Sequence, residues 1–240
     1  GALYSVVENT AGQLGLVDVE VAWNSTVTVP RRVAIDGFIT TACAGDQHSA
    51  AITGEGSLWV WGYNGSGQLG LADKEDRTVP TAVTGSFEKA TMIAAGVNVS
   101  IAIDGDGFVW KSGQLYIEPQ SSTFTRVQFP DTAGLPVGVS CAYKHAVVWT
   151  AEGRLFTWGM GFDGQLGHGS NESSDVPRQV QALEAVPIAS AAAGVGATLA
   201  LDRNGNLWSW GEGLALGHGG NDESQQLLPK VIEGLPQGAT

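Results

Sequence analysis

Basic residues are scarce in this 240-residue sequence, which has 12 Lys and Arg against 24 Asp and Glu and a formal net charge of −12. No segment gathers the few basic side chains into a stripe. Because proteins hold a phosphate backbone through clustered Lys and Arg, this charge balance argues against nucleic-acid binding. We therefore expect no nucleic-acid partner.

Long apolar runs and cysteines are also scarce. The longest apolar run, residues 188–201, contains glycine and is shorter than the roughly 20 residues that a membrane-spanning helix needs, so we expect no membrane insertion. The two cysteines, Cys43 and Cys141, are too few for a disulfide framework, which favours an intracellular location in an unknown compartment. They hold equivalent positions in small-residue segments, and we predict that both are buried and inert.

Glycine, by contrast, is abundant at 34 of 240 residues, without a period of three. Many tight turns explain such a content, and many turns imply many short strands. The turn-rich composition therefore favours an all-β protein.

Internal repeats organise the chain. Three segments share a small-residue strand, a turn, a second strand, a glycine turn, a third strand that ends in Trp-Gly, and a glycine-rich loop: Cys43–Gly70, Cys141–Gly167 and Ala193–Gly217. A fourth copy, Ala94–Gly113, has Ser112 where the others have the tryptophan, and Leu3–Gly15 matches the end of a fifth. The Trp-Gly glycines and their counterpart Gly113 recur at a period of about 50 residues.

Each repeat contains the pattern of four short antiparallel strands. Apolar and polar residues alternate in the second and third strands, and a fourth strand follows around Pro80, Pro177 or Pro229. Proline has no N–H to donate, so it suits an edge strand or a bulge. The pattern predicts a β-propeller of four-stranded antiparallel blades. The expected repeats are 1–38 (partial), 39–89, 90–136, 137–187 and 188–240.

The motifs together resemble the regulator of chromosome condensation (RCC1) repeat. They are the Ala-Gly-x-x-His turn, the Trp-Gly pair, the Asn-x-x-Gly-Gln-Leu-Gly loop and the Pro-x-x-Val segment, and they cover essentially the whole chain. The resemblance implies a ring of seven blades, of which this chain supplies about four and a half. We expect the remaining blades to come from residues outside these 240 or from another chain.

No arrangement of residues indicates catalysis or a bound cofactor. His48 and His145 share one repeat position and His168 and His218 share another, so equivalent histidines are spread over different blades rather than converging on a metal. Nucleophile-elbow, zinc-protease and phosphate-loop motifs are missing from the sequence. We predict a non-catalytic protein without metal or cofactor, acting as a protein–protein interaction scaffold in a larger assembly.

The tryptophans invite comparison with the ultraviolet photoreceptor of the same repeat family. Its Gly-Trp-Arg-His-Thr turn would fall at residues 45–49, 96–100 and 194–198, where this chain has neither tryptophan nor arginine. We therefore interpret the tryptophans as core residues of the third strands: Trp59, Trp61, Trp110, Trp158, Trp208 and Trp210.

Loops on the faces of the propeller are the expected contact surfaces. The acidic loops Asp73–Arg77 and Asn171–Asp175 are two of them. The third repeat departs most from the pattern, in residues 114–125, where we expect Tyr116, Ile117 and Phe124 to be exposed. The side chains predicted to contact a partner are Asp46, Gln47, His48, Lys144, His145, Tyr116, Ile117 and Phe124.

Two alternatives to a scaffold stay open. The resemblance includes guanine-nucleotide exchange factors for Ran-type small GTPases, for which Asp46 and His48 would qualify as turn residues. The spacing of the repeats leaves no room for an added hairpin wedge, and the turns at Gly96 and Gly194 lack the histidine. A secreted enzyme inhibitor is the second alternative.

Overall fold

Short antiparallel strands make up nearly all of the regular structure. The computed structural model describes residues 1–16, 25–213, 216–219 and 224–234, and within them there are strands β1 to β18 and one short 3-10 turn, η1 (Gln181–Leu183). The all-β prediction is therefore confirmed. The chain folds into two compact units, Gly1–Gln114 with Glu118–Val127 and Leu115–Ile117 with the described part of Gln128–Thr240.

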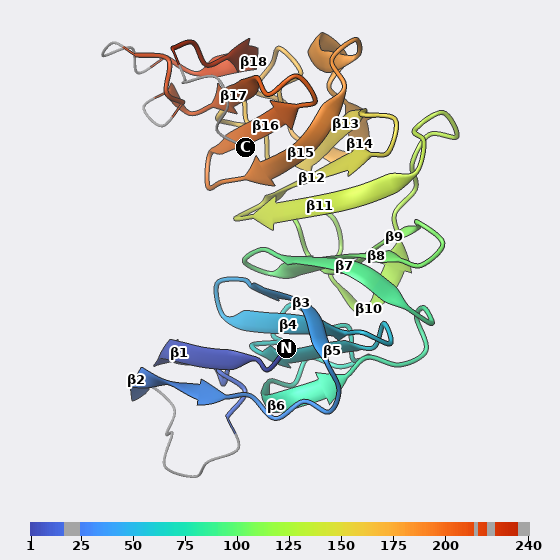
Figure 1. Cartoon of the computed structure of the whole chain (residues 1–240), viewed down its shortest axis with the longest axis vertical. Coiled ribbons are helices and arrows are strands. Elements are labelled where there is room, and N and C mark those ends of the chain that lie inside the picture. The colour runs from blue at the N-terminus through green and yellow to red at the C-terminus, as the bar shows by residue number, and fades with distance from the viewer. Residues whose placement is uncertain (17–24, 214–215, 220–223, 235–240) are drawn as a thin grey trace. The chain divides into compact units, whose positions relative to one another are not determined.

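The first unit contains one two-stranded and two four-stranded sheets, all antiparallel (Figure 1). The two-stranded sheet pairs β1 (Tyr4–Asn9) with β2 (Ser25–Arg32). The other sheets, in spatial order, are β3 (Ile39–Ala44), β4 (His48–Thr53), β5 (Leu58–Gly62) and β6 (Arg77–Ala82), and then β7 (Ala90–Ala95), β8 (Val99–Asp104), β9 (Val109–Gly113) and β10 (Ser121–Arg126).

The second unit contains two more four-stranded sheets of the same order. They are β11 (Pro136–Ala142), β12 (His145–Thr150), β13 (Leu155–Gly159) and β14 (Ser174–Gln179), followed by β15 (Ile188–Ala193), β16 (Ala197–Asp202), β17 (Leu207–Gly211) and β18 (Gln226–Val231). Sequence neighbours pair within each sheet, and separate sheets are not joined into a continuous one. Separate four-stranded sheets with sequential strand order are the arrangement of propeller blades, as the repeats predicted.

The fourth strand of each complete blade lies at an edge and is irregular. Between the pairs Val60–Thr81 and Gly62–Arg77 the register shifts, and Pro80 lies in the shifted segment. Pro177 and Pro229 lie in the same shift of β14 and β18. An edge bulge needs no N–H from these residues, so the predicted role of the prolines is confirmed.

The loop after the third strand is held by its own amide side chains. Gln13, Gln68 and Gln165 each accept, through Oε1, the backbone N–H two residues earlier, at 2.7–3.0 Å. Asn9 and Asn64 accept the N–H five residues later. These bonds fix the Asn-x-x-Gly-Gln-Leu-Gly loop without any partner from outside.

This loop attaches each blade to the next one within a unit. The main-chain carbonyl of Gln13 accepts the indole N–H of Trp61 at 2.8 Å, and that of Gln165 accepts the indole N–H of Trp210 at 2.8 Å. The indoles cover Gly15 and Gly167, where an added Cβ would lie only 2.7 Å from the indole nitrogen. Glycine is therefore required at these two positions, which also have positive φ.

The third blade makes the same attachment with different residues. Ser112 replaces the tryptophan and donates its hydroxyl to the carbonyl of Gly67 at 2.6 Å. The space over Gly70 is filled instead by Phe124, 2.4 Å from the position of an added Cβ. Phe124 also replaces the bulge proline, because its place in the β9–β10 register matches that of Pro80 in the β5–β6 register.

The expectation that Phe124 is exposed is therefore wrong. Its side chain is 4% exposed and belongs to the apolar core that joins the second and third blades. Where the other complete blades have a tryptophan, the third blade has the smaller Ser112, and the ring of Phe124 from the neighbouring strand fills the space in this core.

The outer side of β16 is partly open in the described part of the second unit. Val147 and Trp149 of β12 pack into the core shared with β15, whereas the equivalent Leu199 and Leu201 of β16 are 37% and 39% exposed. A further blade would cover such a face. Completion of the ring by other residues or another chain stays a prediction.

We predict that Ser112→Trp and Phe124→Pro compensate one another. Each single change should lower the free energy of unfolding by about 2 kcal/mol, the first by overpacking and the second by leaving a cavity. The double variant recreates the combination found in the other complete blades, so it should recover at least half of the summed loss. Urea denaturation of all four proteins measures the coupling, and additive losses would contradict the exchange.

Candidate functional site

The predicted contact turns lie at one end of each blade. In an antiparallel sheet, the turn between the first and second strands and the loop after the third strand lie at the same end. The backbone confirms this arrangement: Tyr63 N–H donates to the carbonyl of Gln47, and Met160 N–H donates to the carbonyl of Lys144, both at 2.8 Å. Loops from different parts of each repeat therefore form one surface, which we call the loop end.

The two turn histidines do not reach that surface. His48 and His145 are both fully buried. His48 Nε2 lies 3.0 Å from Ser100 Oγ, and His145 Nε2 lies 2.9 Å from Thr198 Oγ1, so each histidine bridges to the second strand of the next blade in its unit. The prediction that these side chains contact a partner is wrong, because they connect adjacent sheets.

Burial keeps both imidazoles neutral. It lowers the pKa of His48 and of His145 from 6.5 to about 4. Thr198 donates its only hydroxyl proton to the carbonyl of Gln165 at 2.7 Å, so His145 must donate from Nε2. Its Nδ1, like that of His48, has no hydrogen-bond partner in the described part of the chain. A neutral, fully enclosed imidazole has no access to a substrate.

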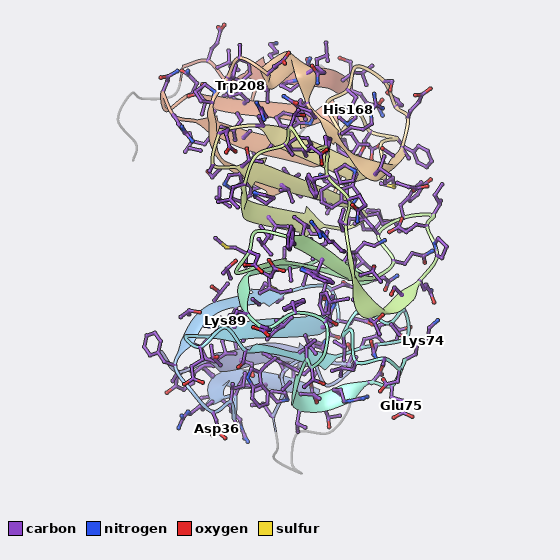
Figure 2. The ribbon with its side chains drawn as sticks, turned by 90° about the vertical axis from the view of Figure 1, so that its right-hand side faces the viewer. Asp36, Lys74, Glu75, Lys89, His168 and Trp208 are labelled. Atoms are coloured by element: carbon purple, nitrogen blue, oxygen red, sulfur yellow. The ribbon has the colours of Figure 1, made fainter. Side chains whose placement is uncertain are left out.

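His168 and His218 also stabilise the scaffold. Their Nε2 atoms lie 3.1 Å from the hydroxyls of Thr157 and Ser209, which donate to main-chain carbonyls of the adjoining loops. Burial, with a smaller contribution from Arg178, lowers the pKa of His168 to about 4. His168 and Trp208 are labelled in Figure 2 among the side chains of the second unit.

The other predicted contacts differ in exposure. Asp46 and Ile117 are exposed, and Gln47, Tyr116 and Lys144 are half-buried. In the acidic loop Asp73–Arg77, Lys74 and Glu75 lie at the surface (Figure 2). The carboxylate of Asp73 is engaged within the loop, where the Arg77 guanidinium lowers its pKa.

Exposed apolar side chains gather at the loop end of the second unit. Ile117 is 66% exposed, Phe162 55%, Val195 69% and Tyr143 40%. The Tyr116 and Phe162 rings meet edge to face with centroids 5.7 Å apart. We name this surface the loop patch: Tyr116, Ile117, Tyr143, Phe162 and Val195.

Sequence reasoning identified only Tyr116 and Ile117 of the loop patch. We predicted Tyr116 and Ile117 because the third repeat departs from the pattern. This criterion misses Phe162, Tyr143 and Val195, which lie in repeats that follow the pattern. A usable signal was present for Phe162, a large apolar residue at a loop position where the aligned repeats have Thr10 and Gly65.

Tryptophans and cysteines belong to the scaffold. Trp61, Trp158 and Trp210 are buried core residues, whereas Trp59, Trp110 and Trp208 are only half-buried, so the prediction of a core position is right for the first three. Cys141 is buried and Cys43 is half-buried, and neither forms a disulfide within the described residues. Burial raises the pKa of the Cys43 thiol to about 12, so its sulfur is not a nucleophile at neutral pH.

Asp and Trp form a repeated pair at the turn between the second and third strands. The carboxylates of Asp104 and Asp202 accept backbone N–H groups of the turn and the indole N–H of Trp110 and Trp208, at 2.7–3.1 Å. These acids are therefore turn residues rather than catalytic ones. Within the described ranges, no three His, Cys, Asp or Glu side chains come close enough to hold a metal ion.

Family comparison decides the identity of the repeat. The model for the "Regulator of chromosome condensation (RCC1) repeat" matches residues 1–52, 55–103 and 152–201, together more than half of the chain. A second model of the same description matches residues 39–68. This chain belongs to the RCC1 repeat family.

Curated relatives of this RCC1-repeat chain include a receptor and part of a ligase. The ultraviolet-B receptor UVR8 of Arabidopsis thaliana is 31% identical over 98% of the chain and 54% of the receptor. The E3 ubiquitin-protein ligase HERC2 of Mus musculus is 29% identical over 98% of the chain and 5% of the ligase. The chain spans about half the length of UVR8 and a small part of HERC2.

Solved RCC1-type structures share the fold. Human WBSCR16 matches with a TM-score of 0.83 and 24% identity, over 95% of this chain and 62% of that protein. Prp20p of Saccharomyces cerevisiae, studied with its binding to Gsp1p and histones, matches with a TM-score of 0.81 and 20% identity, over 98% and 59%. The propeller architecture is thus shown. No helix in the described residues is long and apolar enough to cross a membrane.

The buried histidines predict a specific pH dependence of stability. The pKa of folded His48 lies below its ordinary value, so the unfolded chain binds the extra proton first. Above about pH 6.5, His48 is neutral in both states and does not lower the free energy of unfolding. As the pH falls from there towards about 4, proton uptake by the unfolded chain lowers the free energy of unfolding by about 1.4 kcal/mol per pH unit. His48→Gln keeps an N–H for Ser100 but does not titrate, so its free energy of unfolding should fall less steeply between pH 7 and pH 5. Parallel pH profiles would contradict a neutral, buried His48.

Proposed function

We propose that this RCC1-repeat chain is a non-catalytic protein-binding scaffold and that a partner docks on the loop patch. The observation that carries the proposal is the exposure of Ile117 and Phe162, both more than half accessible, beside the Tyr116 ring. Large apolar and aromatic side chains at a surface are the usual anchors of protein interfaces. A rigid set of blades holds these anchors in fixed positions.

Two carboxylates flank the Phe162 and Val195 side of the loop patch, whereas the Lys144 ammonium lies 5.4 Å from the centre of the Tyr143 ring. Asp163 follows Phe162 in the sequence. Glu212 lies beside the turn that carries Val195, because its N–H donates to the carbonyl of Gly196. Both carboxylates lie within 3.3 Å of the position of a Cβ added at Gly196. With a net charge of −12 on the whole chain, basic or neutral partner surfaces are favoured.

The relatives support an interaction or regulatory role in general. Since the chain spans about half of UVR8, the activity of the whole protein is itself a proposal. The receptor-like light response gains no support, because the turns at Gly45, Gly96 and Gly194 carry neither tryptophan nor arginine. An intracellular location also stays a prediction, based on the low cysteine content.

Only one of the two residues suggested for an exchange factor is accessible to a partner. Asp46 is exposed, but His48 is buried and engaged with Ser100. Faster release of fluorescent nucleotide from a Ran-type GTPase on addition of the protein would establish exchange activity and replace the scaffold proposal. Inhibition of a secreted enzyme would do the same for the inhibitor alternative.

We predict that Ile117→Ser with Phe162→Ser weakens partner binding strongly and leaves the fold intact. Removing two interface anchors costs about 2–4 kcal/mol of binding, a loss of roughly 30-fold or more. Val176→Ser is the matched control, since Val176 is 61% exposed in the same unit but lies on the edge strand β14. Quantitative affinity purification from the native cell, with thermal unfolding of each variant, gives the readout. Partners that are retained by the double variant, or lost equally from the control, would overturn the loop patch.

A further inference from the structure

The residue before the second strand has the same place in every complete blade. Its carbonyl accepts the N–H of the residue after the glycine that ends the third strand, at 2.8 Å in each case. These bonds align four pairs of residues at the loop end: Gln47 with Tyr63, Asn98 with Gln114, Lys144 with Met160 and Gly196 with Glu212. The aligned position therefore carries a polar or basic side chain in three blades and no side chain in the last one.

In the last blade, two carboxylates lie over Gly196. A Cβ added at Gly196 would be 2.8 Å from Glu212 Oε2 and 3.3 Å from Asp163 Oδ2. Glu212 follows β17 of the same blade, whereas Asp163 comes from the loop after β13 of the preceding blade. The two oxygens are separated by no more than the sum of these distances, so two negative charges from different blades converge on one position.

Neither carboxylate has a cation of this chain as a partner within the described residues. All 12 Lys and Arg residues of the sequence lie in the ranges that the structure describes, and none of them forms an ion pair there with Asp163 or Glu212. Lys144, in the turn of the preceding blade, has its ammonium 5.4 Å from the centre of the Tyr143 ring. Two like charges held close together without a counter-ion favour the approach of an external cation.

Apolar side chains of the loop patch border this carboxylate pair. Phe162 and Val195 are next to Asp163 and Gly196 in the sequence, and their side chains are 55% and 69% exposed. Glu212 is exposed and Asp163 is half-buried. The carboxylate pair is therefore accessible at the loop end, beside two apolar anchors of the loop patch.

We propose that an arginine side chain of the partner protein bridges Asp163 and Glu212 beside Phe162. The proposal rests on the loop patch as the docking surface and adds the class of residue that this surface selects. A guanidinium presents its N–H donors in one plane, so a single group can donate to two carboxylates while it packs against an aromatic ring. The ammonium of lysine is a compact and more strongly hydrated charge, so we expect arginine rather than lysine.

Peptides serve as the probe. A phage-displayed library of random dodecapeptides is selected on the wild-type chain, and the peptides taken forward are those whose binding is weakened by Ile117→Ser with Phe162→Ser. These loop-patch peptides should contain an arginine, and its replacement by citrulline, which has a similar shape but no charge, should weaken binding about 10-fold or more. Asp163→Asn and Glu212→Gln should each weaken binding about 3-fold or more, and together about 10-fold or more. Glu184→Gln, which removes one exposed carboxylate in the linker after β14, is the matched control and should have no effect.

A lysine supplied by the chain itself should compete with the arginine of the peptide. Gly196→Lys gives the last blade the side chain that the preceding blade has in Lys144, and its ammonium can neutralise Asp163 and Glu212. The backbone at Gly196 is not left-handed, and the three atoms nearest to an added Cβ belong to the side chains of Glu212 and Asp163, so a side chain is tolerated there. Gly196→Gln is the matched control, because Gln47 has the aligned position in the second blade. Gly196→Lys should bind loop-patch peptides about 10-fold more weakly than Gly196→Gln, at the same unfolding temperature.

A titration with small ligands gives a readout that depends on no variant. N-acetyl-arginine amide is added to the isotope-labelled wild-type chain, with N-acetyl-citrulline amide and N-acetyl-lysine amide as control ligands. The arginine ligand should shift the amide resonances of Gly196 and Glu212 at a lower concentration than either control, and it should leave the amide of Gln47 unmoved.

The outcomes separate the arginine site from the loop patch itself. Loop-patch peptides that bind equally well without arginine, or that are indifferent to Asp163→Asn with Glu212→Gln, would overturn the arginine site and leave the loop patch standing. Equal shifts of Gly196 with the three small ligands would also overturn it. Selection that yields no peptide sensitive to Ile117→Ser with Phe162→Ser would count against the loop patch and, with it, against this proposal.

Discussion

In each of the two units, the main-chain carbonyl of a loop glutamine attaches one sheet to the following one. The carbonyl of Gln13 accepts both the indole of Trp61 and the hydroxyl of Ser49, and the carbonyl of Gln165 accepts Trp210 and Thr198 in the same way. These donors come from the second and third strands of the following blade. The amide side chains of the loop hold the carbonyl in place, and glycine beside it admits the aromatic ring.

This attachment explains which residues are left for function. Histidines, hydroxyls and turn carboxylates that would suggest chemistry in isolation are already bonded within or between blades, as His145 with Thr198 and Asp202 with Trp208 show. The residues that differ most between the repeats of this chain lie outside these attachment contacts. The loop patch is such a place, and its exposed side chains are apolar and aromatic rather than nucleophilic or acidic.

Most of the fold could be predicted from the sequence, because strand alternation, glycine turns and the edge proline are local signals that recur in phase. The errors concern contacts between repeats. The burial of Phe124 depends on the space over Gly70 in the preceding blade, and that of His48 depends on Ser100 in the next blade. A single repeat contains neither partner. Of the five loop-patch residues only Tyr116 and Ile117 were predicted, since Phe162 lies in a repeat that follows the pattern.

Hydrogen exchange of the indole N–H groups tests the attachment most directly. If the loop carbonyl joins the blades, the indoles of Trp61 and Trp210 should exchange only by opening of the sheets, as slowly as the central strand amides of β4 and β16. The indole of Trp208, bonded within its own blade and half-buried, should exchange faster. Exchange of Trp61 and Trp210 at the rate of Trp208, with the strands still protected, would contradict the account.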